Sequence, residues 1–117
     1  MAKTVLIVDD HPSFRTNARA LLEAEGYEIV GEAADGAGAI EAAQRLRPDV
    51  LLLDVQLPDM DGFSVAEELM RNGWKPQVVL TSSRDLSDFG AIVHKCGACG
   101  FVPKGDLSAD TLSALLE

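Results

Sequence analysis

Long hydrophobic runs are missing from this 117-residue chain, since none reaches the ~18–20 residues that a membrane helix needs. Positive charge is also scarce, because 10 lysines and arginines stand against 19 aspartates and glutamates, for a formal net charge of −9. Such a charge repels nucleic-acid phosphates and anionic lipid surfaces. We therefore expect this chain alone to bind neither nucleic acid nor a membrane.

Cysteine is nearly absent, with Cys96 and Cys99 the only two. No signal-type apolar stretch follows Met1, so we expect a cytoplasmic chain without a disulfide framework. The C-x-x-C spacing lacks a second ligand pair for zinc, and Cys96 continues the apolar stripe of an expected helix. The sequence thus favours core packing over a zinc or redox site for these residues.

Hydrophobic residues make up 47% of the chain, which is enough for the core of one domain over residues 1–117. Nearly continuous Val, Leu and Ile runs predict strands that are covered on both faces. Shorter or more polar runs predict strands at the sheet edges. The expected central strands are Val5–Val8, Val50–Leu53 and Val78–Leu80, and the expected edge strands are Ile29–Ala33 and Gly100–Val102.

Apolar residues spaced three and four apart predict five helices between and after these strands. The helices are marked by Phe14, Ala18, Leu21 and Leu22 behind Pro12; by Ala39, Ile40, Ala43 and Leu46 before Pro48; by Phe63, Ala66, Leu69 and Met70; by Phe89, Ile92, Val93 and Cys96; and by Ser108 as the N-cap of the fifth. Five strand–helix units predict an α/β fold, a flavodoxin-like doubly wound parallel sheet with strand order 2-1-3-4-5.

Polar side chains follow four of the predicted strands. Asp9 and Asp10 follow the first, Asp54 the third, residues 81–83 supply hydroxyls after the fourth, and Lys104 follows the fifth. Such sheets bind ligands at the carboxyl ends of their strands, so we expect the carboxylates to converge and repel one another. Mg²⁺ suits an open, carboxylate-rich site. A cation, a hydroxyl and an ammonium around one carboxylate predict a site for a phosphoryl group.

Four motifs carry a family resemblance that covers essentially the whole chain: residues 5–11, 51–62, 79–83 and 97–104. In this order they resemble the receiver domain of bacterial two-component response regulators. Residues 9–15 further resemble the subfamily commonly joined to a helix-turn-helix DNA-binding domain, which would lie outside this chain. The resemblance implies a signalling switch, not an enzyme, that takes a phosphoryl group from a sensor histidine kinase or a phosphotransfer protein.

Carried over residue by residue, the resemblance makes Asp54 the phosphoacceptor. It implies that Mg²⁺ is held by Asp9, Asp10 and Asp54, with the backbone carbonyl of Gln56 as a further ligand. Lys104 would contact the phosphoryl oxygens. These roles are expectations from the family, and the residues that bear them match its motifs position by position.

The resemblance also implies a conformational switch. Ser82 would be the hydroxyl that moves toward the phosphoryl group, and Phe101 the aromatic side chain whose rotamer follows. The distance along the chain to Lys104 favours Ser82 over Thr81. The face formed by the fourth helix, fifth strand and fifth helix would then repack, serving as the output surface and as a route to a homodimer.

Two further features lie near the expected phosphoryl site. Gln56 and Arg84 flank the path of a hydrolytic water and are expected to tune the lifetime of the phosphoryl group, although Arg84 also fits an exposed loop cation. Many relatives have proline after the lysine, whereas here Pro103 precedes Lys104. The geometry of the loop after the fifth strand is therefore not predicted.

Other functions compete with the switch. A phosphorylation-independent binding module could keep the same fold, but the intact acidic, hydroxyl and lysine positions argue against it. A small phosphatase with an aspartyl nucleophile needs a second aspartate where this chain has Gln56. No glycine-rich nucleotide motif follows a strand. His11, next to the acidic pair, is expected to be a turn residue at the start of a helix instead of a base or ligand.

Overall fold

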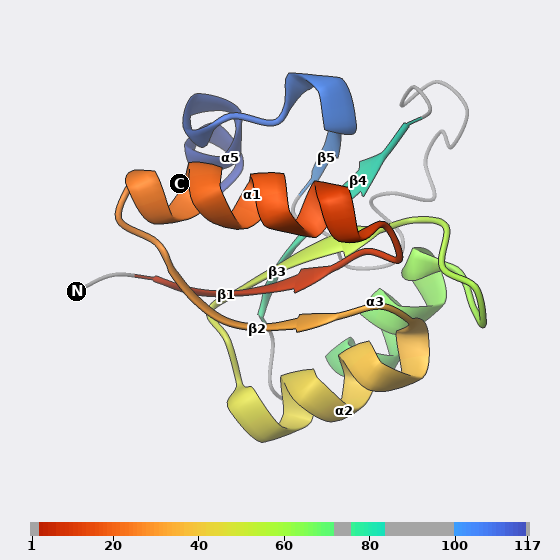
Figure 1. The fold of residues 1–117 in the computed structure, drawn as a ribbon. Coiled ribbons are helices and arrows are strands. Elements are labelled where there is room, and N and C mark those ends of the chain that lie inside the picture. Colours follow the sequence, from red (N-terminus) through yellow and green to blue (C-terminus); the bar gives the residue numbers. More distant parts are fainter. Residues whose placement is uncertain (1–2, 72–75, 84–99, 117) are drawn as a thin grey trace.

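The computed structural model describes residues 3–71, 76–83 and 100–116 (Figure 1). Five parallel strands form one sheet in the order β2-β1-β3-β4-β5, which confirms the predicted fold and its two edge strands. The strands are β1 Thr4–Val8, β2 Glu28–Ala33, β3 Val50–Asp54, β4 Gln77–Ser82 and β5 Gly100–Pro103.

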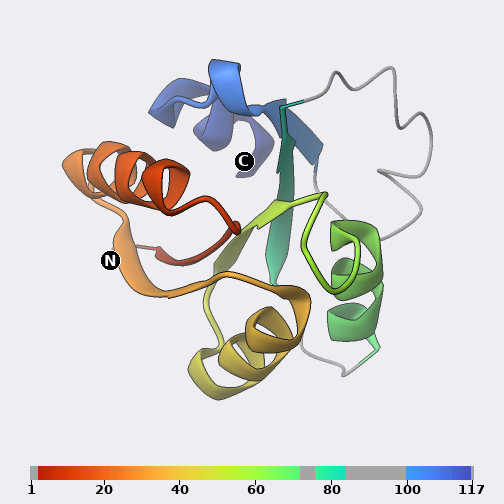
Figure 2. The ribbon, with the colours of Figure 1, turned by 45° about the vertical axis from the view of Figure 1, so that its right-hand side comes forward.

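Helices cover both faces of this sheet. They are α1 Pro12–Ala24, α2 Gly36–Leu46, α3 Gly62–Met70 and α5 Ala109–Leu116, with a short 3-10 turn at Lys104–Asp106. In Figures 1 and 2, α1 and α5 lie on one face, and α2 and α3 on the other. The predicted fourth helix, with Cys96 and Cys99, lies outside the described residues. Within the described ranges no helix has the length and apolar character that a membrane span requires.

The core consists of two apolar clusters, one on each face of the sheet. Alternate residues of a strand point to opposite faces. Leu51 and Leu53 of β3 therefore pack on the face of α3 with Leu69, while Leu52 packs on the face of α1 with Leu22. Each such leucine is buried and contributes about 1.5–3 kcal/mol to folding. This double-sided packing holds the central strands in register, so that their polar carboxyl ends meet at one edge.

Two helix starts, at Pro12 and Ser108, are confirmed, and the structure adds the caps of two others. Pro12 occupies the first turn of α1. The side chains of Asp35 and Asp61 cap α2 and α3, accepting from backbone amides at 2.7 and 2.8 Å. Ser108 Oγ accepts from the amide of Thr111 at 3.1 Å, which confirms the predicted N-cap of α5.

Strand β4 is longer than predicted. The sequence indicated Val78–Leu80, because the apolar run stops there, but the strand continues through Thr81 and Ser82. These polar residues stay in the sheet because they pair with Val102 and Pro103 of β5. Such pairing does not depend on side-chain polarity, which is why the hydrophobic pattern missed it. Pro103 is tolerated in β5 because this strand lies at the sheet edge.

Candidate functional site

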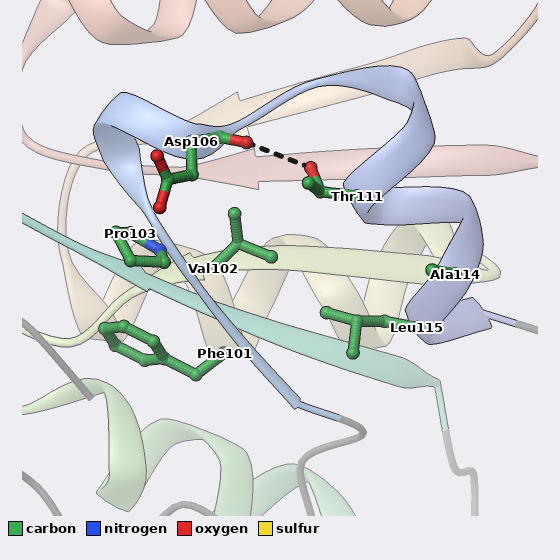
Figure 3. Close-up of a pocket in the computed structure, with 7 residues that line it drawn as sticks. All are labelled: Phe101, Val102, Pro103, Asp106, Thr111, Ala114 and Leu115. Atoms are coloured by element: carbon green, nitrogen blue, oxygen red, sulfur yellow. Dashed lines mark hydrogen bonds between the residues drawn. The ribbon is translucent and has the colours of Figure 1, made fainter. Parts of the chain in front are cut away.

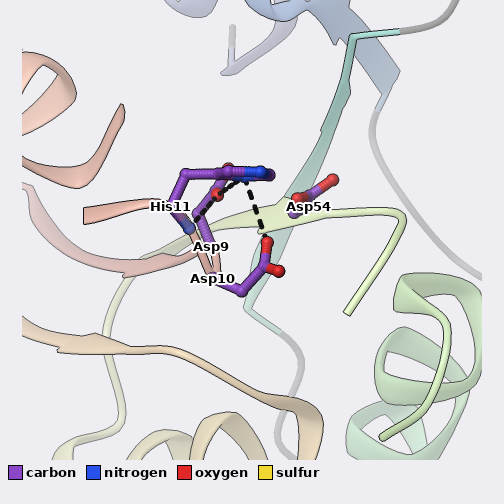
Figure 4. A group of neighbouring side chains, drawn as sticks. All are labelled: Asp9, Asp10, His11 and Asp54. Carbon is purple, nitrogen blue, oxygen red and sulfur yellow. Dashed lines mark hydrogen bonds and ion pairs between the residues drawn. The ribbon is translucent and has the colours of Figure 1, made fainter. Parts of the chain in front are cut away.

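The carboxyl ends of β1 and β3 bring three aspartates and a histidine together (Figure 4). One ligand atom from each of Asp9, Asp10, His11 and Asp54 lies within 4.8 Å of the others. The cluster forms because β1 and β3 are paired neighbours in the sheet. Asp9 and Asp54 are buried, with 0% and 3% of the residue exposed, whereas Asp10 and His11 are exposed. The site therefore has a buried floor, formed by Asp9 and Asp54, and an open rim, formed by Asp10 and His11.

Asp9 is held from both sides. Its Oδ1 accepts a hydrogen bond from the backbone amide of His11 at 2.8 Å and lies 2.9 Å from Nδ1 of the same residue. Since a carboxylate only accepts, the ring proton at this contact belongs on Nδ1. Asp9 Oδ2 forms an ion pair with Lys104 Nζ at 2.6 Å but has no partner of good hydrogen-bond geometry among the described residues.

His11 has a larger place in the site than the sequence indicated. Its backbone is the N-cap of α1, as expected for a turn residue. Its ring, however, also lies 3.1 Å from Asp10 Oδ1 and 3.5 Å from Lys104 Nζ. One sequence signal was available, because the amide two residues after a strand-end aspartate often bonds that aspartate's side chain. That bond turns the chain and brings the His11 ring into the cluster.

Lys104 follows β5 directly and reaches across the sheet edge. Its Nζ lies 3.2 Å from Asp54 Oδ2, in addition to its ion pair with Asp9, and 4.7 Å from the centroid of the Phe14 ring. Burial alone lowers the pKa of Lys104, but the short ion pair with Asp9 and the negative charge of Asp54 outweigh it and raise the pKa. Lys104 is therefore a cation that pairs with two carboxylates, those of Asp9 and Asp54.

Asp54 is the carboxyl group whose ionisation the site opposes. Burial is the main cause of its raised pKa, and the charge of Asp9 adds to it. The backbone amide of Gln56, at 3.1 Å from Asp54 Oδ1, and the Lys104 ammonium act in the opposite direction without cancelling the rise. The cluster is thus short of positive charge, which a bound cation would supply.

The donor set fits Mg²⁺. The carboxylates of Asp9, Asp10 and Asp54 offer oxygen atoms, which are the ligands that Mg²⁺ prefers, and the open rim leaves room for the waters that it keeps. Asp9 Oδ2 is a buried oxygen without a well-aligned donor, and a cation would satisfy it. His11 is the one nitrogen donor of the cluster.

A closed loop follows Asp54. Gln56 forms an isolated antiparallel bridge with Asp61, and the amide of Gly62 donates to the carbonyl of Val55 at 2.7 Å. Gly62 is required here, because a Cβ atom would overlap the backbone carbonyl oxygen of Asp54. The loop therefore places the Gln56 backbone directly beside Asp54, with its side chain exposed.

The residues expected to form the switch lie on β4 and β5. Ser82 is buried at the end of β4, the strand next to β3, and pairs with Pro103. Thr81 is also buried, and its Oγ1 has no hydrogen-bond partner among the described residues. Phe101 is half-buried and lines a hollow between β5 and α5 (Figure 3). Arg84 lies outside the described residues.

Comparison with known proteins agrees with this geometry. A family model described as the response regulator receiver domain matches residues 5–117. The nitrate/nitrite response regulator protein NarP of Escherichia coli K12 is 42% identical over 101 residues, which cover 86% of this chain and 47% of NarP. The chain spans 29–55% of the length of the curated relatives that it matches.

Solved structures show the same fold. The signal receiver domain of the response regulator NarL from Mycobacterium tuberculosis superposes with a TM-score of 0.86 at 34% identity, covering 98% of this chain and 97% of that domain. A CheX–CheY–BeF₃–Mg²⁺ complex from Borrelia burgdorferi contains a chain with a TM-score of 0.87 at 25% identity, covering 97% of this chain and 86% of that one. Sheet order, acidic cluster and family match agree, and the chain belongs to the response regulator receiver domain family.

Proposed function

We propose that this chain is a phosphorylation-dependent signalling switch in which Asp54 accepts a phosphoryl group from a phosphohistidine of a sensor histidine kinase or phosphotransfer protein. One observation carries the proposal: the buried Asp54 carboxylate lies at a strand end, with a second buried aspartate and the Lys104 ammonium beside it. A carboxylate in this setting can act as a nucleophile.

The transfer is an in-line displacement at phosphorus. An Asp54 carboxylate oxygen forms the new bond to phosphorus while the bond from phosphorus to the histidine nitrogen breaks. The electron pair of that bond returns to the imidazole, and Asp54 becomes an acyl phosphate. Lys104, already 3.2 Å from Asp54 Oδ2, is close enough for its ammonium to contact the transferred oxygens.

Asp9, Asp10 and Asp54 would hold Mg²⁺, together with the backbone carbonyl of Gln56. The ion supplies positive charge that offsets the repulsion between the anionic acceptor and the anionic donor. Asp9 contributes a buried oxygen, and Asp10 contributes one at the open rim. The CheX–CheY complex from Borrelia burgdorferi, which includes Mg²⁺, supports this assignment by similarity of fold.

The output follows from the new charge on Asp54. Ser82 lies at the end of the neighbouring strand, and we expect its hydroxyl to move toward the phosphoryl oxygens. Phe101 then fills the vacated space and repacks the face of β5, α5 and the predicted fourth helix, which also offers a surface for a homodimer. Gln56 and Arg84 tune the lifetime of the phosphoryl group.

Phosphorylation by a small donor tests the assignment of Asp54. Wild type and Asp54→Asn are incubated with acetyl phosphate and Mg²⁺ and separated on a phosphate-affinity gel. We expect a shifted band only for wild type, and its loss when EDTA is added, because the nucleophile and the cation site are both required. Equal labelling of the two proteins, or labelling that is indifferent to EDTA, would contradict the proposal.

A further inference from the structure

The loop after β3 is tied to the start of α2. Asp59 Oδ1 accepts a hydrogen bond from the backbone amide of Gly36 at 2.7 Å, and Asp59 Oδ2 accepts one from the amide of Ala37 at 3.0 Å. These are the first two amides of α2. In Figures 1 and 2 this loop lies beside the start of α2. We call this pair of bonds the Asp59 clasp.

The clasp is separate from the helix's own cap. Asp35, the N-cap residue of α2, accepts from the third amide, that of Gly38, at 2.7 Å. Two aspartates thus share the start of one helix, but only Asp59 comes from another segment of the chain. Its two bonds also lower the pKa of Asp59, so the clasp consists of an anion at the positive end of a helix.

Packing at the clasp is close. Gly36 has no side chain, and a Cβ atom there would overlap the Met60 side chain and lie 3.2 Å from Asp59 Oδ1. The tip of the loop therefore rests directly on the backbone of α2. Hydrogen bonds and contact together fix the tip in one place relative to the sheet.

The other end of the same loop borders the candidate cation site. Gln56 and Asp61 form the bridge that closes the loop, and the amide of Gln56 donates to Asp54 Oδ1 at 3.1 Å. Only residues 57–60 separate the bridge residues. Because so short a loop has little freedom, a shift of its tip is transmitted to the peptide groups beside Asp54.

We propose that Asp59 is a positioning residue for the cation site: its clasp on α2 holds the loop so that the backbone carbonyl of Gln56 faces the cation. This inference rests on the proposed function, since it concerns the affinity of the same site for Mg²⁺. It assigns Asp59 a role without any contact to the cation, through loop geometry alone.

Asp35→Ala provides a matched control for Asp59→Ala. Both substitutions remove a carboxylate from the start of α2, so both weaken the helix, but only Asp59→Ala releases the loop. Mg²⁺ affinity is measured by isothermal titration calorimetry, and thermal unfolding is recorded for each protein. We expect Asp59→Ala to weaken Mg²⁺ binding about tenfold, and Asp35→Ala to leave it within about twofold of wild type.

Two further measurements sharpen the test. Asp59→Asn keeps one acceptor oxygen, so its Mg²⁺ affinity should fall between wild type and Asp59→Ala. In wild type the NMR signals of the Gly36 and Ala37 amides should shift as Mg²⁺ binds, since the clasp couples them to the site, and these shifts should disappear in Asp59→Ala.

The outcomes separate this inference from the proposed function. If wild type binds Mg²⁺ but Asp59→Ala and Asp35→Ala weaken binding equally, the positioning role is wrong while the proposed cation site stands. If Asp59→Ala binds Mg²⁺ as tightly as wild type, the positioning role is likewise wrong and the proposed cation site still stands. If wild type shows no saturable Mg²⁺ binding at all, both proposals fail together.

Discussion

At the scale of single residues, the fold works against the charged form of Asp54. Burial and the nearby Asp9 raise its pKa, and the bonds from Gln56 and Lys104 only partly compensate. Without a bound cation the ionised side chain therefore destabilises the folded protein. A buried carboxyl group with a raised pKa is typical of functional sites, which retain such groups at a cost in stability.

Replacing this carboxylate should stabilise the protein when no divalent cation is present. The folded-state pKa of Asp54 is raised, so its destabilising effect is absent below its ordinary pKa of about 4 and grows as the pH rises through the folded-state value. Asp54→Asn keeps the oxygen that accepts from Gln56 and removes the charge. We expect a higher urea midpoint than wild type at pH 7 in EDTA.

The pH dependence provides the control for this prediction. The difference in urea midpoint between Asp54→Asn and wild type should shrink toward pH 4, because the wild-type carboxyl group then also becomes neutral. A variant less stable than wild type at pH 7 would show instead that the ion pair with Lys104 outweighs burial.

At the scale of elements, β4 ends in two adjacent hydroxyl residues beside β3. Thr81 and Ser82 are adjacent and buried, yet they pair with different residues: Thr81 with Asp54 and Val102, Ser82 with Pro103. Adjacent strand residues point to opposite faces of the sheet, so only one of the two hydroxyls suits a given partner. The family resemblance selects Ser82 for the phosphoryl group.

Ser82→Ala should still be phosphorylated, since the nucleophile and the acidic cluster are untouched, but it should lose the coupling to Phe101. A charge-assisted hydrogen bond is worth roughly 1–2 kcal/mol, enough to shift a two-state equilibrium about tenfold. The measurement is the NMR shift of amides around Phe101 when beryllofluoride, a phosphoryl mimic, is added.

Thr81→Val is the matched control on the same strand. The Thr81 hydroxyl has no hydrogen-bond partner among the described residues. Replacing it with the isosteric apolar side chain of valine should therefore preserve the beryllofluoride response and cost little stability. If Thr81→Val loses the response while Ser82→Ala keeps it, the switch hydroxyl has been assigned to the wrong residue.

At the scale of the whole molecule, the charge is the dominant property. The chain has a formal net charge of −9, and the edge of the sheet that carries the cluster of aspartates is itself acidic. Relatives such as NarP are response regulators about twice as long as the matched region.

Residues 1–117 should therefore not bind DNA. We expect no mobility shift of a DNA duplex at physiological salt, because a protein with this charge gains nothing from the release of counterions. Phosphorylated and unphosphorylated protein should behave alike in this assay. A sequence-specific shift by either form would overturn the prediction.

The linear sequence by itself determined the fold and most of the site. Continuous apolar runs predicted the buried strands, and apolar residues three and four apart predicted the helices. Together these elements led to the sheet order 2-1-3-4-5, which is the order observed. Once that order is known, Asp9, Asp10, Asp54 and Lys104 must meet, because the carboxyl ends of parallel strands share one edge. Periodicity is encoded in the local sequence pattern, and the strand order follows from it through the topology rules of doubly wound parallel sheets.

Only the tertiary structure decided the contacts that depend on distance between segments. The extension of β4 through Ser82 depends on pairing with β5, the approach of the His11 ring to Lys104 depends on where β5 ends, and the Asp59 clasp joins residues 22 and 23 positions apart. Hydrogen bonds between remote segments leave no periodic trace in the sequence, since any polar residue can form them. They appear only when packing brings a donor and an acceptor together.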